Sequence, residues 1–288
     1  MSCILSAFAD ESGKSTEEQI DALKRNKISH VDLRNVDGFN IVDVTPEHAE
    51  QVREKLDAAG LRAGMFGSPI GKIDIADDVK KDLDRLQNLG KISGILGCNA
   101  VRIFSYYNAG NAPEETWRQE SLRRLRLLRD LAQDLGLVLY HENERHIFGD
   151  PCKRVLALAD ALHDGKTFRL IFDFDNYQQS GDDVWDNWTK LSNRTDAFHL
   201  KDSDKQNQHV PIGEGNGQAR KILEAALKQG WKGPLSLEPH LARSPAVMAT
   251  GPSGQANVKL KDMTPPQCFD VAAQTAHRLF KDIGAKVI

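Results

Sequence analysis

The sequence lacks the long apolar runs that a membrane-spanning helix needs. No stretch of its 288 residues approaches the roughly 18–20 consecutive apolar residues that cross a bilayer. The N-terminal segment 1–14 also lacks the basic start and the long apolar stretch of a secretory signal,. We therefore expect a cytoplasmic protein without a membrane partner.

Closely spaced cysteines and an excess of positive charge are also lacking. The four cysteines, Cys3, Cys98, Cys152 and Cys268, form no C-x-x-C pair, which argues against a zinc ribbon and a disulfide framework. Lysine and arginine number 38 against 41 acidic residues, for a net charge of −3. A slightly acidic chain is a poor nucleic-acid binder, so we expect no nucleic-acid partner.

The chain does contain a regular alternation of short apolar runs and helical patterns. Hydrophobic residues make up 40% and charged residues 27% of the sequence, as in ordinary globular proteins. Strict alternation favours parallel strands joined by helices, and eight repeats favour a closed (β/α)₈, or TIM, barrel. We therefore predict a single TIM-barrel domain over residues 1–288. The predicted strands cover residues 3–9, 30–34, 61–67, 100–105, 137–143, 169–174, 196–201 and 234–238.

Helix boundary signals support this reading, and one long segment departs from it. Either Ser15 or Thr16 is suited to cap the first helix and Thr45 the second, and Gly60 and Gly136 are suited to end helices,. The segment 242–264, after the eighth strand, contains proline and glycine and no periodic pattern. Loops of this length are usually functional, so we expect it to cover a binding site.

Four predicted strand ends carry residues with the chemistry of a metal site. Glu142, Asp173, His199 and Glu238 end strands five to eight, one residue from each. Active sites of (β/α)₈ barrels lie at these carboxyl ends. Three carboxylates and one imidazole favour Mn²⁺ or Mg²⁺, with Co²⁺ and Zn²⁺ as alternatives. Solvated strand ends or a ring of salt bridges are the other reading, which four consecutive strand ends make less favourable.

Several cationic side chains are expected at the same end of the barrel. Lys72 and Arg102 would bring positive charge to the barrel mouth, and Lys201 follows His199 on the same strand face,. We interpret Lys72, Arg102 and Lys201 as substrate-binding residues, which hints at a phosphate or carboxylate on the substrate. Ion pairs are the competing interpretation, with partners among Asp10, Glu11, Asp32, Asp202 and Glu238.

Three motif-like segments are set aside. Residues 141–146 resemble H-E-x-x-H, but the second histidine comes one residue late and on a strand end,. Residues 67–72 and 213–217 are glycine-rich, but neither has the spacing of a phosphate- or dinucleotide-binding loop,. His141 and His240 each neighbour a proposed ligand but alternate to the other strand face, where packing is the favoured role.

A series of short segments, in order along the chain, resembles the xylose isomerase-like TIM barrels, and in particular their sugar phosphate isomerase/epimerase branch. Each segment is weak alone, but together they span all eight predicted strands. The segments are FADE (8–11), DLRNVDG (32–38), GSPIGK (67–72), VRIFSYY (101–107), HENE (141–144), FDFDN (172–176), FHLKD (198–202), PIGEGNGQ (211–218) and LSLEPHL (235–241).

This resemblance implies one divalent metal ion held by Glu142, Asp173, His199 and Glu238. The D-x-x-N pattern of the family implies that Asn176 contacts substrate. The implied activity is a metal-dependent isomerase or epimerase acting on a sugar or sugar phosphate. Such reactions remove a proton next to a carbonyl, whose enediolate the metal stabilises. Glu142 and Glu238 are the expected catalytic acid/base pair.

Three other functions are kept as alternatives. A lyase that eliminates a β-substituent from a 3-keto-sugar derivative starts with the same proton removal, so the sequence does not separate it from an isomerase. An apurinic-site endonuclease shares the barrel, but it needs more strand-end histidines than this chain has. A non-catalytic sugar-binding protein would not need four metal ligands. The particular sugar and the formation of a homo-oligomer are left open.

Overall fold

The protein is described by a computed structural model that covers residues 2–249, 251 and 254–288. Within these ranges, eight parallel strands close into a barrel, in which β9 pairs with β10 and β13 pairs with β2. The predicted (β/α)₈ TIM barrel is confirmed. In chain order the barrel strands are β2 (Leu5–Ala7), β3 (His30–Leu33), β6 (Arg62–Phe66), β7 (Ala100–Ile103), β8 (Val138–Glu142), β9 (Phe168–Asp173), β10 (Thr195–Leu200) and β13 (Leu235–Leu237).

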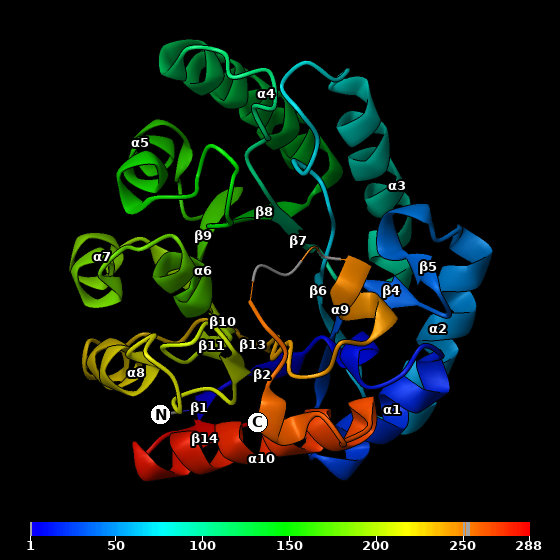
Figure 1. Cartoon of the computed structure of the whole chain (residues 1–288). Helices are drawn as coiled ribbons and strands as arrows, with labels where there is room; N and C mark the ends of the chain where they lie inside the picture. Colours follow the sequence, from blue (N-terminus) through cyan, green and yellow to red (C-terminus); the bar gives the residue numbers. More distant parts are fainter. Residues whose placement is uncertain (1, 250, 252–253) are drawn as a thin grey trace.

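Helices form an outer ring around the strands (Figure 1). Each helix buries an apolar stripe against the sheet, which is the usual arrangement in parallel barrels. The barrel opening at the carboxyl ends of the strands is thereby left for loops. The helices of the ring are α1 (Thr16–Arg25), α2 (Pro46–Ala59), α3 (Lys80–Leu96), α4 (Glu114–Leu135), α5 (Cys152–Leu162), α7 (Val184–Leu191), α8 (Ala219–Lys228) and α10 (Pro265–Asp282).

The predicted helix boundaries are found in the structure. Of the two candidates for the first cap, the structure has Ser15, whose side chain accepts a hydrogen bond from the backbone N–H of Glu18 and completes a capping box. The Thr45 side chain accepts from the backbone N–H of His48 at the start of α2. Gly60 and Gly136 end α2 and α4 in the left-handed conformation, which glycine adopts without steric cost.

The first predicted strand is shorter than expected. The predicted run 3–9 divides into β1 (Ser2–Cys3) and β2, and the chain then turns into a short 3₁₀ helix, η1 (Ala9–Glu11). β1 pairs with β14 (Lys286–Val287) rather than with the barrel. The turn at η1 buries the Asp10 and Glu11 side chains at the barrel mouth.

The structure also adds elements that the sequence pattern did not predict. The helix α6 (Phe174–Gln179) begins directly at the end of β9 and is capped by the Asp173 side chain. Two hairpins extend from the strand ends, and their two-residue strands are too short to show a periodic pattern. These hairpins are formed by β4 (Asn35–Val36) with β5 (Phe39–Asn40), and by β11 (Asp202–Ser203) with β12 (His209–Val210).

The segment 242–264 is not wholly irregular. It contains the short helix α9 (Pro245–Ala249) and the 3₁₀ helix η3 (Val258–Leu260). Residues 250 and 252–253 of this segment lie outside the described residues. A single continuous loop over 242–264, and one domain over all 288 residues, therefore stay predictions.

The hydrophobic core has two parts. Inside the barrel, Met65, Tyr140, Ile171 and Ala197 fill the end away from the strand carboxyl termini. A larger cluster lies between the strands and the helices. It includes a group of buried aromatic rings in edge and stacked contact near β9 and β10, formed by Phe172, Phe174, Tyr177, Trp188, Phe198 and Trp231.

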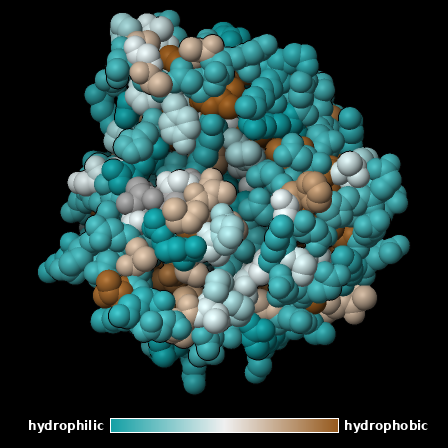
Figure 2. Space-filling view, turned by 45° about the vertical axis from the view of Figure 1, so that its right-hand side comes forward, coloured by the Kyte–Doolittle hydropathy of each residue, from teal (hydrophilic) through white to brown (hydrophobic). Residues whose placement is uncertain are grey.

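The surface drawn in Figure 2 is mainly hydrophilic, with apolar residues in small separate groups. Large apolar side chains that are exposed include Phe39, Met248 and Val258, and such scattered residues are normal on soluble domains. Among the described residues, no helix combines the length and the apolar character that crossing a bilayer requires.

The aromatic group near β9 and β10 predicts a large difference between two similar truncations. Trp188 is 2% exposed and its ring contacts Phe172 and Phe198, whereas Phe39 is 57% exposed. Trp188→Ala is expected to lower the free energy of unfolding by about 3–5 kcal/mol. Phe39→Ala is expected to change it by less than about 0.5 kcal/mol. Urea unfolding followed by circular dichroism measures both, and equal effects would contradict this packing.

Candidate metal centre

The four predicted metal ligands lie together at the carboxyl ends of β8, β9, β10 and β13. One ligand atom from each of Glu142, Asp173, His199 and Glu238 lies within 4.8 Å of the others. All four side chains are buried, with exposures of 2% or less. They meet because parallel strands in register bring consecutive strand ends to one side of the barrel. The pairing of Asp173 with His199 across β9 and β10 is part of that register.

The donor atoms in this cluster face one another. His199 Nδ1 lies 3.0 Å from Glu142 Oε1 and 3.2 Å from Glu238 Oε2. Glu142 Oε2 and Asp173 Oδ2 are buried and make no hydrogen bond with the described residues, although cationic nitrogens lie 3.3 and 3.1 Å from them. Buried polar atoms without hydrogen bonds are costly and call for an explanation. Three carboxylates and one imidazole nitrogen suit a divalent ion such as Mg²⁺, Mn²⁺ or Zn²⁺.

Asn176 holds two of the proposed ligands in place. Its backbone N–H donates to Asp173 Oδ1 at 2.8 Å, and its side-chain Nδ2 lies 3.3 Å from Glu142 Oε1. The same Nδ2 donates to the Asn143 carbonyl, while Asn143 and Asp173 exchange two further hydrogen bonds. The predicted role of Asn176 in substrate binding stays a prediction, because its amide is already engaged with the ligands.

Two cationic side chains lie against the same carboxylates. Arg102 Nη1 is 3.1 Å from Glu238 Oε1 and 3.3 Å from Glu142 Oε2, and its guanidinium stacks on Phe104. Lys201 Nζ is 3.1 Å from Asp173 Oδ2 and 3.9 Å from Glu238 Oε2. Both residues were predicted to bind substrate, and both lie at the centre.

Lys72 lies farther out. Its Nζ pairs with Glu144 at 2.9 Å and lies over the Phe104 ring. The ion-pair partner of Lys72 is therefore Glu144, and those of Arg102 are Glu142 and Glu238, rather than Asp10, Glu11 or Asp32. Since every one of these cations has a carboxylate partner, the structure gives no separate support for a charged substrate.

The centre holds more carboxylates than cations. Among the described residues, ion pairs join five carboxylates to three cationic side chains, an excess of two negative charges when the imidazoles are neutral. One divalent ion would balance this excess. The carboxylates are Asp10, Glu11, Glu142, Asp173 and Glu238, and the cations are Arg34, Arg102 and Lys201.

The pKa values of the cluster reflect both its burial and its excess of negative charge. Burial alone would lower the pKa of His199, but Glu142 and Glu238 outweigh burial and raise that pKa to about 10. Burial raises the pKa of Glu11 to about 8 and that of Asp173 well above its usual value. For Glu238, by contrast, Arg102 and Lys201 outweigh burial and hold the pKa well below its usual value.

Arg34, Glu11 and His240 are site residues that the sequence analysis did not select. Arg34 Nη1 lies 2.8 Å from Glu238 Oε1. His240 Nε2 lies 3.6 Å from both Glu11 and Glu238. His240 therefore faces the carboxylates of the site, in addition to the packing role expected from the sequence. The backbone of His240 has a φ of +50°, a conformation that is strained for a residue with a side chain. The DLR sequence at the end of the second strand was the available signal for Arg34.

The segment after β13 lies near this centre. A cavity of about 410 Å³ is lined by Asp10, Glu11 and Asn35 on one side and by Pro245 and Ala246 of α9 on the other. This volume is in the range of small-molecule sites. The expectation that the segment covers the site gains support from this contact but stays a prediction.

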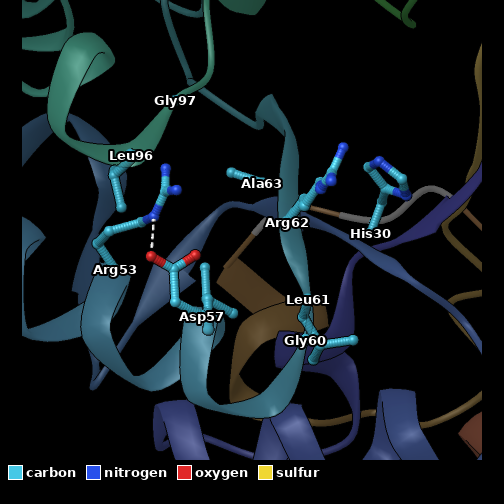
Figure 3. Close-up of a pocket in the computed structure, with 10 residues that line it drawn as sticks. His30, Arg53, Asp57, Gly60, Leu61, Arg62, Ala63, Leu96 and Gly97 are labelled. Carbon is cyan, nitrogen blue, oxygen red and sulfur yellow. Dashed lines mark hydrogen bonds and ion pairs between the residues drawn. The ribbon is translucent and has the colours of Figure 1, made fainter.

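A second cavity lies at the opposite end of the barrel. It has a volume of about 650 Å³ and is bordered by α2, the end of α3 and the start of β6. Figure 3 shows Arg53 hydrogen-bonded to Asp57 in this cavity, with His30 and Arg62 on the adjacent strands. Conserved chemistry in (β/α)₈ barrels lies at the other end, and this cavity has no cluster of metal ligands among the described residues.

Comparison with known protein families agrees with the barrel fold described above. The sequence profile described as "Xylose isomerase-like TIM barrel" matches residues 20–256. This match covers most of the chain, so the protein belongs to the xylose isomerase-like TIM barrel family. A comparison with curated proteins gives no match.

Solved structures share the fold at low sequence identity. The probable 3-DHS dehydratase AsbF from Bacillus anthracis has a TM-score of 0.69 and 14% identity, with coverage of 96% of this chain and 98% of that one. The 3-keto-D-glucoside 4-epimerase YcjR from E. coli has a TM-score of 0.67 and 14% identity, with coverage of 97% and 99%. A Mycobacterium smegmatis protein of this fold, in complex with magnesium, has a TM-score of 0.66 and 16% identity, with coverage of 95% and 97%. These similarities show the fold alone.

The raised pKa of His199 predicts that metal binding releases protons. An imidazole must be neutral to bind a metal ion, and a pKa of about 10 keeps His199 protonated near neutral pH. Binding of Mn²⁺ is therefore expected to release about one proton per ion and to strengthen as the pH rises toward 9. Calorimetric titrations in buffers of different ionisation enthalpy measure this release. Proton-neutral binding would contradict a protonated His199 in the metal-free protein.

Proposed function

We propose that the protein is a divalent-metal-dependent isomerase or epimerase that acts on a sugar by removing a proton next to a carbonyl group. The buried cluster of Glu142, Asp173, His199 and Glu238 is the observation that carries this proposal. Mn²⁺ and Mg²⁺ are the proposed ions, with Co²⁺ and Zn²⁺ as alternatives. An ion held there would supply positive charge that stabilises the enediolate oxygen.

Glu142 is the first candidate for the base. Both carboxylates contact Arg102 and His199, but Glu238 also contacts Arg34 at 2.8 Å, whereas Glu142 contacts no second arginine among the described residues. The additional positive charge of Arg34 therefore makes Glu238 the weaker base of the two. We propose that Glu142 takes the proton from one face of the sugar and passes it to solvent. For an epimerisation, Glu238 would relay a proton from solvent to the opposite face, so that no net proton is gained or lost.

The cationic side chains at the centre would orient the substrate. Lys201 Nζ and Arg102 Nη1 lie within 3.3 Å of the ligand carboxylates. If those carboxylates turn toward an ion, Lys201 Nζ and Arg102 Nη1 become free to donate hydrogen bonds to hydroxyl or carbonyl oxygens of the substrate. Lys72 and Asn176 are proposed to contact the more distant substrate hydroxyls.

A β-eliminating lyase is the second candidate. The structurally similar enzymes include one named as a dehydratase and one named as a 3-keto-D-glucoside epimerase. The second name includes a keto sugar derivative, and removal of a proton next to its carbonyl would begin either an epimerisation or an elimination. We propose that 3-keto-glycosides belong in the substrate panel together with free ketoses.

Deuterium exchange tests the proposed first step. Ketoses and 3-keto-glycosides are incubated with the protein and Mn²⁺ in heavy water, and deuterium next to the carbonyl is measured by mass spectrometry. Glu142→Gln keeps the size of the side chain and removes the base, so exchange is expected to slow by about 10²–10⁴-fold. Glu238→Gln is expected to slow turnover within the same range.

Glu144→Gln is the matched control. It is the same substitution two residues along the chain, at a side chain that pairs with Lys72 outside the four ligands, and near-native exchange is expected. The metal content of each variant is measured, because loss of a ligand would mimic loss of a base. Conversion of a substrate without exchange, by metal-loaded Gln variants, would rule the mechanism out.

A further inference from the structure

A second group of potential ligands adjoins the first. Glu11, Glu238 and His240 each offer an atom within 4.8 Å of the others, and all three side chains are buried. His240 Nε2 lies 3.6 Å from Glu11 Oε1 and 3.6 Å from Glu238 Oε1. Two carboxylates and an imidazole are suitable ligands for a metal ion. Because Glu238 belongs to both groups, the two groups together have the outline of a two-metal site, in which ions lie about 3.5–4 Å apart.

Arg34 already occupies this second group. Its Nη1 lies 2.8 Å from Glu238 Oε1 and its Nη2 lies 3.4 Å from Glu11 Oε1. These are the same two oxygens that face His240. A guanidinium and a divalent ion cannot both use these oxygens, because two cations so close together repel strongly in a buried site.

Other contacts hold the Arg34 guanidinium rigidly. Asp10 accepts from Nε and Nη2 of Arg34, both at 2.8 Å, in a two-pronged pair. The guanidinium also stacks on Phe8, 4.9 Å from the ring centre. A Cβ on Gly67 would lie 2.5 Å from Phe8 and 3.0 Å from the Arg34 Cβ, so glycine leaves the room this stack needs. Arg34 itself is 3% exposed.

We propose that Arg34 is a built-in cation that takes the place of a second divalent ion, so that Glu238 bridges one metal ion and one guanidinium. The inference rests on the proposed function, because it requires the first group to bind an ion. Arg34 is then a positioning residue. It holds Oε1 of Glu238 together with Arg102, whose Nη1 lies 3.1 Å from the same oxygen, while Oε2 faces His199 and Lys201. The centre binds one ion, and its second positive charge does not depend on metal supply.

Counting ions in Arg34→Met tests the proposal. Methionine keeps the apolar stem and removes the charge, which leaves Asp10 and Glu11 without their cationic partner, while Glu238 keeps its contact with Arg102. Elemental analysis is expected to find one Mn²⁺ per chain in the wild type and two in Arg34→Met. Because the second ion would share Glu238 with the first, an exchange-coupled electron paramagnetic resonance spectrum is expected. This spectrum separates a bridged pair from an ion bound loosely at the surface.

Two variants serve as controls. Arg34→Lys keeps a positive charge at the same position, and it is expected to bind one ion. Arg124→Met removes a different buried arginine, on α4, which pairs with Glu120 and backbone carbonyls. It is also expected to bind one ion. Two ions in either control would show that a second site does not depend on the charge of Arg34, and would overturn the proposal.

The remaining outcomes are also decisive. A wild type that binds no ion contradicts the proposed function itself, whereas a wild type with one ion and Arg34→Met with one uncoupled ion contradicts only the role of Arg34. If Arg34→Met does not fold, Arg34→Gln is counted, and both variants are refolded in Mn²⁺. Failure of both to fold with Mn²⁺ overturns the proposal, since a bound ion is expected to replace the guanidinium.

Discussion

Buried negative charge at the carboxyl ends of the strands is the constraint on which the rest of the site depends. A carboxylate removed from water is costly unless cations and hydrogen bonds compensate it. Here the Glu238 carboxylate is shared between two arginines and His199, and Asp173 pairs with Lys201. The barrel supplies these partners from strands at every side of the mouth. The carboxylates whose burial the fold must compensate are also the groups that would attract a divalent ion to this position.

The sequence predicted the barrel because its signals are local. Alternating runs, the Ser15 and Thr45 caps and the glycine helix ends each act over a few residues, and eight of them in order leave few topologies open. The clustering of the four proposed ligands was predictable for a related reason. Once strands five to eight are parallel and adjacent, their last residues must lie together, whatever the side-chain details.

The parts that were missed depend on contacts between distant residues. Arg34 meets Glu238 across 204 positions of sequence, and nothing near Arg34 in the chain indicates which carboxylate it contacts. Lys72 pairs with Glu144 rather than with an aspartate for the same reason. The short helix α6 and the hairpin strands have too few residues for a periodic pattern. Their positions follow from tertiary contacts, such as the Asp173 cap of α6.

At His240, the stability of the backbone and the arrangement of the site make opposite demands. A residue with a side chain at φ +50° carries strain of about 1–3 kcal/mol, which glycine would largely avoid. The fold alone would thus be better served by glycine after Pro239. The strained geometry instead brings the imidazole to the Glu11 and Glu238 oxygens. Replacing His240 by glycine would therefore relieve the strain in the backbone. The same change would remove the imidazole that lies beside the Glu11 and Glu238 carboxylates.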